Sequence, residues 1–570
     1  MTKVKAKMIK KSIKVQKEDS EDNGSSLTYI LPLLGLGGGA GAAAGGGGSD
    51  STVPAVTFTI APPAPATSTP SPAPVTPPTV TDLKTINFKY VDNAFVGNMP
   101  LPGKFQLITT VAVIDINKDG YKDIVIHAFE KVLGDNASQN LGDVPTPNKI
   151  SVLINNNGLF FSEETSKYVL GNATLSGASR KVEVVDINND GIKDIIFACN
   201  REDGRSGQQH EYNTGFMNVM LSTPNGYEIK QFGEEDWYHA AGYATLNGVT
   251  YVAGSGFLRG SPGKSELQGG FSYNGGEFTE TIKFPFQLSP NNFIFFESPN
   301  SNSTDCLIQT AAAPNWLGVE GWQIQNGEWI KVGQFDTPGT FIKDVTVKTY
   351  NGNVQEAQIY KLGDDYIIVG MGNSITESSK IDINHNGEYA VVMKLEAAIV
   401  KNFDPNTTTY IDQTVDVTPS DRLVFYTIKD GKLIDLKIEV ADSTPSLINA
   451  TALNVIDFNN DGYDDIVLSS FTKTGLPEVY LNDKDGSFTA TEIKVDHSVS
   501  FAIDGFSIID DFNNDGIIDL VTMPANGQSL TDSVSMSTFA YYHGTTAIDI
   551  SPQPVNPFAY TYTNTAGWFG

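Results

Sequence analysis

Aspartates and asparagines recur in this sequence with a spacing that suits a bound metal ion. The segments DINKDGYKD (115–123), DINNDGIKD (186–194), DFNNDGYDD (457–465) and DFNNDGIID (511–519) all fit the pattern D-x-N-x-D-G-x-x-D. Side chains at positions 1, 3 and 5 turn their oxygens toward one concavity, and the glycine at position 6 permits a sharp turn. The carbonyl at position 7 and the aspartate at position 9 then complete a shell of about six to seven hard oxygens, which suits Ca²⁺.

The residues around these segments exclude an EF-hand, which has glutamate at position 12 and flanking helices. Position 12 is instead occupied by Ile126, Phe197, Leu468 and Thr522. The flanks are short apolar and β-branched runs, so we expect each segment to join two strands. One such segment would be compatible with a chance Asx-rich turn, but four in the same frame favour calcium binding.

A fifth segment, DINHNGEYA (382–390), keeps the frame but has lost two of the acids. Asp382, Asn384 and Asn386 remain, while Ala390 replaces the closing aspartate. Whether this segment binds metal is therefore left open.

A second pattern, a turn of Asn/Asp-Gly type between two β-rich runs, predicts hairpins. The glycines concerned are Gly158, Gly226, Gly276, Gly327, Gly431, Gly486 and Gly544. The interval of 104 residues between Gly327 and Gly431 indicates either an insertion or two units with one hairpin lost. One loop and one hairpin per unit give four strands in about 65 residues, so the sequence predicts a seven-bladed β-propeller of four-stranded antiparallel blades. Two units, at 238–256 and 297–311, lack the acidic loop.

These loops and hairpins resemble the FG-GAP/VCBS repeat family, whose members include the integrin α-subunit propeller and many secreted bacterial proteins. The resemblance covers most of residues 107–570 and implies a seven-bladed propeller with about four Ca²⁺ sites in its blade loops. The side-chain ligands that it implies are Asp115, Asn117, Asp119, Asp123, Asp186, Asn188, Asp190, Asp194, Asp457, Asn459, Asp461, Asp465, Asp511, Asn513, Asp515 and Asp519. The carbonyl ligands that it implies are those of Tyr121, Ile192, Tyr463 and Ile517.

The bulk composition fits a cation-binding, secreted or surface protein, and an acidic surface that only keeps the protein soluble is the alternative. The formal net charge of −28 argues against binding to nucleic acid or to an anionic membrane surface through the main body. Cys199 and Cys306 are too few and too far apart for a disulfide framework or a zinc site. Because every proposed metal ligand comes from the chain, we interpret the ions as structural staples rather than catalytic centres.

The chain divides into three zones by composition. Residues 1–50 begin with lysines and continue through an apolar run into a Gly/Ala-rich stretch, which indicates either an export or surface-targeting segment or a disordered tail. Residues 51–82 form a Pro/Thr/Ala-rich linker, which we expect to be extended. Residues 83–570 are the predicted propeller, so any membrane contact would involve the N-terminal tail alone.

No catalytic motif accompanies this pattern, which leaves enzymatic activity uncertain and not favoured. We expect an extracellular or cell-surface module that binds a glycan or a protein. Two alternatives stay open, a secreted polysaccharide-active enzyme and a structural component of a surface assembly. Arg201, Arg205, His210 and Tyr212, in a long polar segment, are candidates for partner contact. The sequence indicates neither the ligand nor the oligomeric state.

Overall fold

The computed structural model describes the chain from residue 85 to residue 545, with gaps. The described residues are 85–96, 106–130, 148–200, 214–236, 238–256, 269–285, 292–299, 301–310, 318–336, 340–348, 354–362, 364–369, 375–395, 397–412, 415–419, 422–438, 440–441, 450–470, 476–496, 505–524 and 539–545. The chain divides into two units, Met1–Pro72 and Ala73–Gly570, and every described residue lies in the second. The predictions for the tail and the linker therefore lie outside the described residues.

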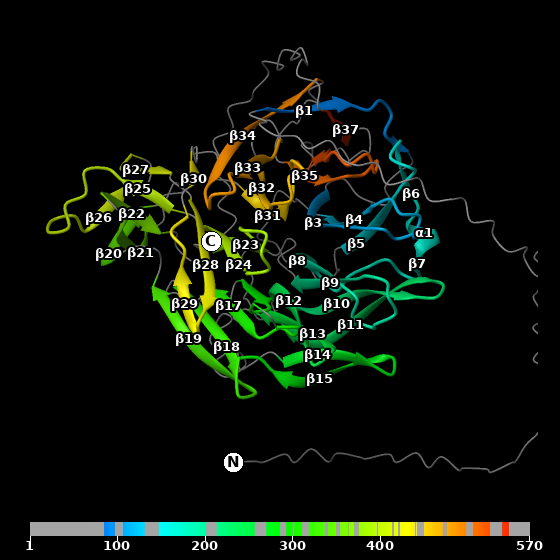
Figure 1. Cartoon of the computed structure of the whole chain (residues 1–570), viewed down its shortest axis with the longest axis horizontal. Helices are drawn as coiled ribbons and strands as arrows, with labels where there is room; N and C mark the ends of the chain where they lie inside the picture. The colour runs from blue at the N-terminus through cyan, green and yellow to red at the C-terminus, as the bar shows by residue number, and fades with distance from the viewer. Residues whose placement is uncertain are drawn as a thin grey trace, which may run out of the picture. The chain divides into compact units, whose positions relative to one another are not determined.

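Within the described residues the structure is all-β, with one short helix, α1 (Thr165–Tyr168). The strands form curled antiparallel sheets arranged around a centre (Figure 1). The prediction of an all-β propeller is therefore confirmed. No helix in the described part of the chain is long and apolar enough to span a membrane.

We group the described strands into blades by their order and pairing, and count blades from the N-terminal side. Blade 1 contains β3 (Gln106–Ile114), β4 (Asp123–Glu130), β5 (Asn148–Asn155) and β6 (Phe161–Glu163), extended by β2 (Phe95–Val96). Blade 2 contains β8 (Ala178–Val185), β9 (Asp194–Asn200), β10 (Thr214–Thr223) and β11 (Gly226–Asp236), extended by β7 (Val169–Leu170). Blade 3 contains β12 (Tyr238–Leu246), β13 (Val249–Gly256), β14 (Gly269–Asn274) and β15 (Glu277–Lys283). Blade 4 contains β16 (Phe293–Phe296), β17 (Cys306–Thr310), β18 (Gly318–Gln325) and β19 (Glu328–Asp336).

The remaining blades follow the same order, from the innermost strand outward. Blade 5 contains β23 (Ile375–Ile381), β24 (Ala390–Leu395), β28 (Arg422–Lys429) and β29 (Lys432–Asp435). Blade 6 contains β31 (Ala450–Ile456), β32 (Asp465–Ser470), β33 (Glu478–Asn482) and β34 (Phe488–Val495), extended by β30 (Val440–Ala441). Blade 7 contains β35 (Gly505–Asp510), β36 (Asp519–Pro524) and β37 (Ala540–Thr545), and β1 (Thr85–Tyr90) is its fourth strand.

The second strand of each blade has the near-continuous apolar character of a strand that is buried on both faces. In β24, every side chain of the run AVVMKL is buried. The outer hairpins of blades 3, 4 and 5 close with two-residue turns that need a positive φ, as at Asn326 (φ 54°) and Gly327 (φ 86°) in blade 4. A blade with the complete pattern therefore contains, in sequence order, an acidic loop, a buried second strand and a Gly-containing hairpin.

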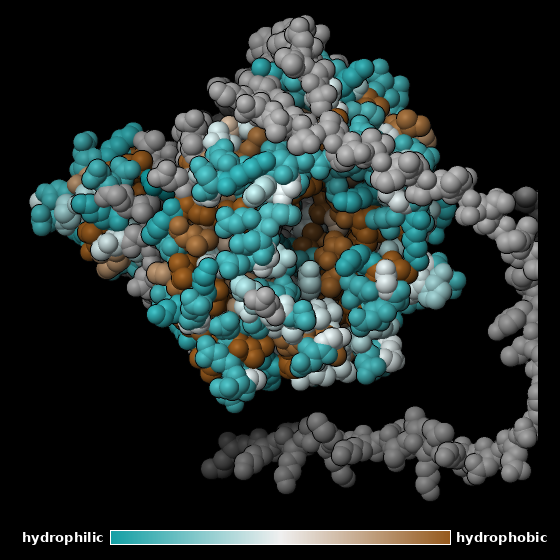
Figure 2. Space-filling model, viewed as in Figure 1, coloured by the Kyte–Doolittle hydropathy of each residue, from teal (hydrophilic) through white to brown (hydrophobic). Residues whose placement is uncertain are grey.

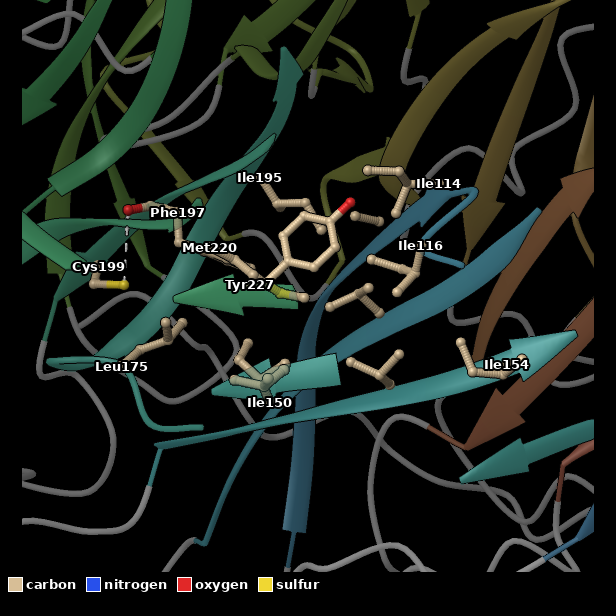
Figure 3. Packing of buried hydrophobic residues seen from close by; sticks show 14 residues of the cluster. Ile114, Ile116, Ile150, Ile154, Leu175, Ile195, Phe197, Cys199, Met220 and Tyr227 are labelled. Atoms are coloured by element: carbon tan, nitrogen blue, oxygen red, sulfur yellow. Dashed lines mark hydrogen bonds between the residues drawn. The ribbon is translucent and has the colours of Figure 1, made fainter. Parts of the chain in front are cut away.

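The cores lie between blades rather than within them. One cluster packs Ile114, Ile150 and Ile154 of blade 1 against Ile195, Phe197 and Tyr227 of blade 2 (Figure 3). Similar clusters join each later blade to the next. A further cluster joins blade 7 to blade 1 through Phe161, Phe512 and Tyr541, so the blades form a closed ring.

The ring closes by joining the two ends of the propeller. Strand β1 pairs antiparallel with β37, with Phe88 opposite Gly544, and pairs parallel with β34, with Phe88 opposite Val495. The N-terminal strand therefore completes the C-terminal blade. The hairpin predicted at Gly544 is wrong, because this glycine lies inside β37, whose two neighbours in the sheet are β36 and β1.

The interval of 104 residues corresponds to an inserted sheet. This sheet has the order β26-β20-β21-β22-β25-β27 and is called here the insert sheet. Its strands are β20 (Thr340–Lys348), β21 (Val354–Leu362), β22 (Asp365–Val369), β25 (Ala397–Val400), β26 (Tyr410–Asp412) and β27 (Val417–Pro419). They leave the ring in two excursions, one before β23 and one between β24 and β28. The insert sheet has its own core, and Tyr360 and Ile367 also pack against blades 4 and 5.

Candidate metal-binding loops

The four D-x-N-x-D-G-x-x-D segments occupy equivalent places in four blades. Each joins the innermost strand of its blade to the second strand, and we name it by its blade. Loop 1 (115–123) joins β3 to β4, loop 2 (186–194) joins β8 to β9, loop 6 (457–465) joins β31 to β32, and loop 7 (511–519) joins β35 to β36. The prediction that each segment connects two strands is confirmed.

The first, third and fifth side chains of each loop gather around the same backbone amides. In loop 1 the amide of Asp119 donates to Asp115 Oδ1 (3.1 Å) and to Asn117 Oδ1 (3.0 Å), and the amide of Gly120 donates to Asp115 Oδ2 (3.0 Å). The Asn117 amide group donates to Asp119 Oδ2 (2.9 Å). The turn is therefore formed around oxygens that belong to the loop itself.

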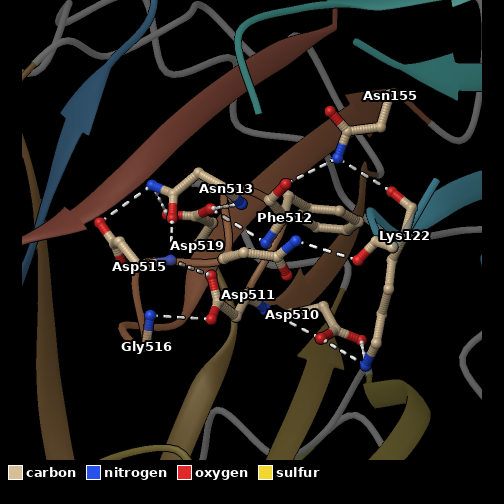
Figure 4. Close-up of polar contacts among 11 residues, drawn as sticks. Lys122, Asn155, Asp510, Asp511, Phe512, Asn513, Asp515, Gly516 and Asp519 are labelled. Carbon is tan, nitrogen blue, oxygen red and sulfur yellow. Dashed lines mark hydrogen bonds and ion pairs between the residues drawn. The ribbon is translucent and has the colours of Figure 1, made fainter. Parts of the chain in front are cut away.

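The same set of bonds recurs in the other three loops. The glycine amide at position 6 lies 2.9 Å from Asp186 in loop 2, 2.8 Å from Asp457 in loop 6 and 2.9 Å from Asp511 in loop 7. Figure 4 shows this arrangement in loop 7, where Asp511, Asn513 and Asp515 surround the turn at Gly516. These carboxylate and amide oxygens are the hard donors that Ca²⁺ prefers, so the residues present fit this ion.

Glycine at position 6 is required by backbone conformation rather than by space. Gly120 has a φ of 92°, and a Cβ atom placed on it would contact nothing within 4 Å. Position 4 is also left-handed, with φ 58° at Asn189, 60° at Asn460 and 58° at Asn514. Asparagine tolerates this conformation better than most residues, which explains its recurrence there.

The aspartate at position 9 has a structural role in addition to the predicted one. Asp123 is fully buried, and its carboxylate accepts bonds from the amides of Ile116 (2.7 Å) and Asn155 (2.7 Å). It therefore fastens the start of loop 1 to the end of β5. Asp194, Asp465 and Asp519 are also fully buried, and each accepts an amide from a neighbouring strand and at least one from its own loop, which for Asp519 supplies two. Sequence reasoning assigned these residues as ligands only and missed the anchor.

Burial raises the pKa of these carboxyl groups despite the amides that they accept. The pKa of Asp123 and of Asp465 is raised to about 7, and that of Asp519 to about 8, with desolvation as the largest cause in each case. Asp119 lies close enough to Asp123 to add repulsion between the two charges. A divalent cation in the loop would oppose both effects.

Comparison with known families identifies the repeat. Residues 457–522 match the family model described as the FG-GAP-like repeat. The chain contains an FG-GAP-like repeat. The matched range begins at loop 6, passes through blade 6 and ends in β36 after loop 7, so it includes two of the four complete loops. The resemblance seen in the sequence is thereby confirmed, and the assignment to a bacterial type stays a prediction.

No curated protein matches the chain. Two solved structures similar to it are crystal structures of BBS1N in complex with ARL6DN, one soaked with mercury and one with lead. The first is 10% identical, with 69% of this chain and 97% of that chain covered and a TM-score of 0.30. The second is 9% identical, with 60% and 95% covered and a TM-score of 0.26.

In blade 4 the corresponding loop lacks the asparagine of position 3 and the aspartate of position 5. In the segment 297–305, Asp305 occupies position 9 and accepts the amide of Ser298 (2.7 Å), as Asp123 accepts that of Ile116. The Ser298 hydroxyl donates to the other oxygen of the Asp305 carboxylate (2.5 Å). The anchor at position 9 is therefore formed in a loop that lacks the acidic pattern. Blade 3 has lost the loop, and β12 turns directly into β13 at Asn247 and Gly248.

The degenerate loop of blade 5 keeps the turn and loses the anchor. Asp382 accepts the amides of Asn386 (3.0 Å) and Gly387 (2.7 Å) in the manner of a complete FG-GAP-like loop. Ala390 has no carboxylate to offer to the position-2 amide. The amide of Asp382, at position 1, donates to Asp464 Oδ2 (2.8 Å) from blade 6. Metal binding in this loop stays open.

Within the part of the chain that the structure describes, no three His, Cys, Asp or Glu side chains are grouped closely enough to hold a metal ion by themselves. Each proposed site relies also on an asparagine and a backbone carbonyl, and the position-9 carboxylate faces backbone amides. The candidate partner residues Arg201, Arg205, His210 and Tyr212 lie outside the described residues.

Proposed function

We propose that this chain is an exported β-propeller, stabilised by Ca²⁺, that binds a glycan or a protein at the cell surface or outside the cell. The observation that carries the calcium assignment is the fourfold recurrence of one oxygen-rich loop at one place in the blade. In each loop positions 1, 3 and 5 and the position-7 carbonyl would hold the ion, with position 9 closing the shell. The bound ion would supply positive charge between carboxylates that otherwise repel one another.

We infer seven blades from the grouping of the strands. This count assigns β1 to the last blade and treats the insert sheet as an addition to blade 5. On this view four blades carry a complete loop, one carries a degenerate loop, and two carry none.

The binding role is supported by the form of the scaffold. A closed ring of sheets holds its connecting loops rigidly, and long loops on such a scaffold are common places for partner contacts. The face in Figure 2 is hollowed near its centre, with hydrophobic residues visible in the hollow. Tyr243, on the innermost strand of blade 3, is 39% exposed, which leaves part of its ring free for a partner.

The calcium assignment is tested by metal analysis and thermal unfolding of the full chain. We expect about four Ca²⁺ per chain after dialysis, and a melting temperature lowered by several degrees in excess chelator, because ligand at about 100 times Kd stabilises by about 2.7 kcal/mol per site. Asp461→Ala should remove one site, and Asn386→Ala, in the degenerate loop, should change little. An unchanged melting temperature in chelator would contradict the assignment.

The binding role needs its own experiments. A glycan array and an activity screen on polysaccharides separate a binding module from a polysaccharide-active enzyme. Self-assembly on addition of Ca²⁺ would instead favour a structural assembly component. Cell fractionation tests export, and a chain found only in the cytoplasm would overturn that part of the proposal.

A further inference from the structure

Neighbouring metal-binding loops are joined by hydrogen bonds from one repeat to the next. The amide group of Asn514, at position 4 of loop 7, donates to the carbonyl oxygen of Gly120, at position 6 of loop 1 (2.9 Å). Asn460, at position 4 of loop 6, donates in the same way to the carbonyl oxygen of Gly516, at position 6 of loop 7. The same two positions are therefore used twice, from loop 6 to loop 7 and from loop 7 to loop 1.

Other bonds reinforce the contact between loops 7 and 1. Lys122 Nζ contacts both carboxylate oxygens of Asp510 at 2.7 and 2.8 Å, and the Asn155 amide group donates to the carbonyl oxygen of Phe512 (2.7 Å) (Figure 4). The backbone amide of Asn155 also donates to Asp123, the position-9 anchor of loop 1. Loop 7 and Asp510, the residue before it, are thus connected to the second half of loop 1 and, through Asn155, to its anchor.

No asparagine continues this series of hydrogen bonds from loop 1 to loop 2. Position 4 of loop 1 is Lys118, and the blade that follows loop 2 has the two-residue turn at Asn247 and Gly248 in place of a loop. Asn189, at position 4 of loop 2, therefore has no metal-binding loop beyond it. Loops 6, 7 and 1 form a connected set, and loop 2 stands apart from it.

The position of these bonds joins them to the proposed ligands. Asn514 lies between Asn513 and Asp515, and its acceptor belongs to the peptide that leads into Tyr121, whose carbonyl is a proposed ligand. Fixing loop 7 around an ion would fix the Asn514 backbone and hold the Gly120–Tyr121 peptide in place. An ion entering loop 1 would then meet a loop that has already lost part of its conformational entropy, which is a source of positive coupling.

We propose that Ca²⁺ binding to loops 6, 7 and 1 is coupled through Asn460 and Asn514, whereas loop 2 binds independently. This inference rests on the proposed calcium function. Coupling between sites is reciprocal, so loss of the ion from loop 7 must weaken loop 1 and loop 6 as well.

The test is a titration of the full chain with Ca²⁺ by calorimetry and with Tb³⁺ by tyrosine-sensitised luminescence. Tyr121 in loop 1 and Tyr463 in loop 6 occupy position 7, where loops 2 and 7 have isoleucine. The Tyr227 and Tyr541 hydroxyls contact loops 2 and 7, at Lys193 O and Asp519 Oδ2, so every variant is made in a Tyr227→Phe, Tyr541→Phe background, in which luminescence reports mainly on loops 1 and 6. Asn514→Ala should weaken binding at loop 1 by about fivefold or more, the lower end of typical coupling. Asn189→Ala is the matched control, because both asparagines have a φ of 58° and suffer the same backbone strain on replacement. It should leave the luminescence titration unchanged.

A second set of variants separates coupling from a damaged fold. Asn514→Gly removes the hydrogen bond without strain at a left-handed position and should reproduce the effect of Asn514→Ala. Asp515→Ala, which removes a proposed ligand of loop 7, should weaken loop 1 in the natural background and have no further effect on it in the Asn514→Gly background. An equal effect of Asp515→Ala in both backgrounds would overturn the coupling. If the natural chain takes up no Ca²⁺, the proposed function itself fails, whereas independent sites in a chain that binds Ca²⁺ refute the coupling alone.

Discussion

Lys122 and Asp510 are 388 positions apart in the sequence, and the Lys122 ammonium lies 2.7 Å from the Asp510 carboxylate. This ion pair spans the junction where the last blade meets the first. The Asp510 side chain is 14% exposed and that of Lys122 is 49% exposed, so water screens the pair in part. The aromatic cluster of Phe161, Phe512 and Tyr541 also packs across this junction. The ion pair is therefore one of several interactions that close the ring.

Lys122→Ala should therefore destabilise the propeller by a modest amount, about 0.5–1 kcal/mol. Lys193→Ala, at the same position of loop 2, is the control, and it should lie within error of the natural chain. The midpoint of urea unfolding, measured at low and at high salt, checks both. A loss that does not shrink as salt rises would show that the charge of Lys122 is not the cause.

Phe88→Ala tests whether β1 completes the last blade. Phe88 is fully buried, packs edge-on against Phe458 with ring centroids 6.3 Å apart, and belongs to the cluster between blades 6 and 7. Removal of such a ring costs about 3–5 kcal/mol. Phe341→Ala, at a side chain that is 46% exposed on the insert sheet, should cost far less. Thermal unfolding compares the two, and equal losses would contradict the role given to β1.

The position-9 anchor should stabilise the fold without metal. Asp305→Ala leaves the amide of Ser298 without its acceptor in a loop that lacks the acidic pattern, and we expect a loss of about 1–3 kcal/mol that is the same with Ca²⁺ and with chelator. Asp115→Ala should instead show its loss mainly when Ca²⁺ is present. Denaturant unfolding of both variants in both buffers gives the four values needed. A calcium-dependent loss at Asp305 would show that blade 4 also binds the ion.

Without metal, stability should fall as the pH rises from about 4 to about 8. Burial raises the pKa of Asp519 to about 8, whereas an aspartate in an unfolded chain has a pKa of about 3.9. The folded protein therefore holds a proton that the unfolded chain has released throughout this window, so the stabilising effect of protonation is lost as pH rises. Melting temperatures in chelator at pH 5 and pH 8 should show the decline, and Asp519→Asn should reduce it. A melting temperature that is higher at pH 8 than at pH 5 in chelator would count against a neutral Asp519.

The sequence was sufficient for the parts of the fold that repeat. The spacing of Asp115, Asn117 and Asp119 and the β-branched flanks predict loops between strands, because both signals are local. The pairing of β1 with β37 was missed because it joins segments at opposite ends of the propeller, and no short pattern around Gly544 distinguishes a hairpin from a strand that pairs elsewhere.

The anchor at position 9 was missed for a related reason. An aspartate such as Asp123 has the same place in the motif whether or not it also accepts two backbone amides, and only the folded chain brings those amides to it. Recurrence of Asp305 in a loop without the aspartates of positions 1 and 5 was the available signal, since a residue retained there serves the fold. The interval before Gly431 did indicate extra residues, but only strand pairing could show that they form one sheet from two excursions.

The placement of β1 has a consequence for biosynthesis. The Tyr90 amide donates to Asp496 Oδ1, a residue 406 positions later. At about 5–20 residues per second, a ribosome needs roughly 20–80 s to make that stretch. During that time the backbone of β1 has neither of its partner strands, and an unpaired strand edge invites aggregation. The ring of the newborn chain therefore stays open until β37 has been made.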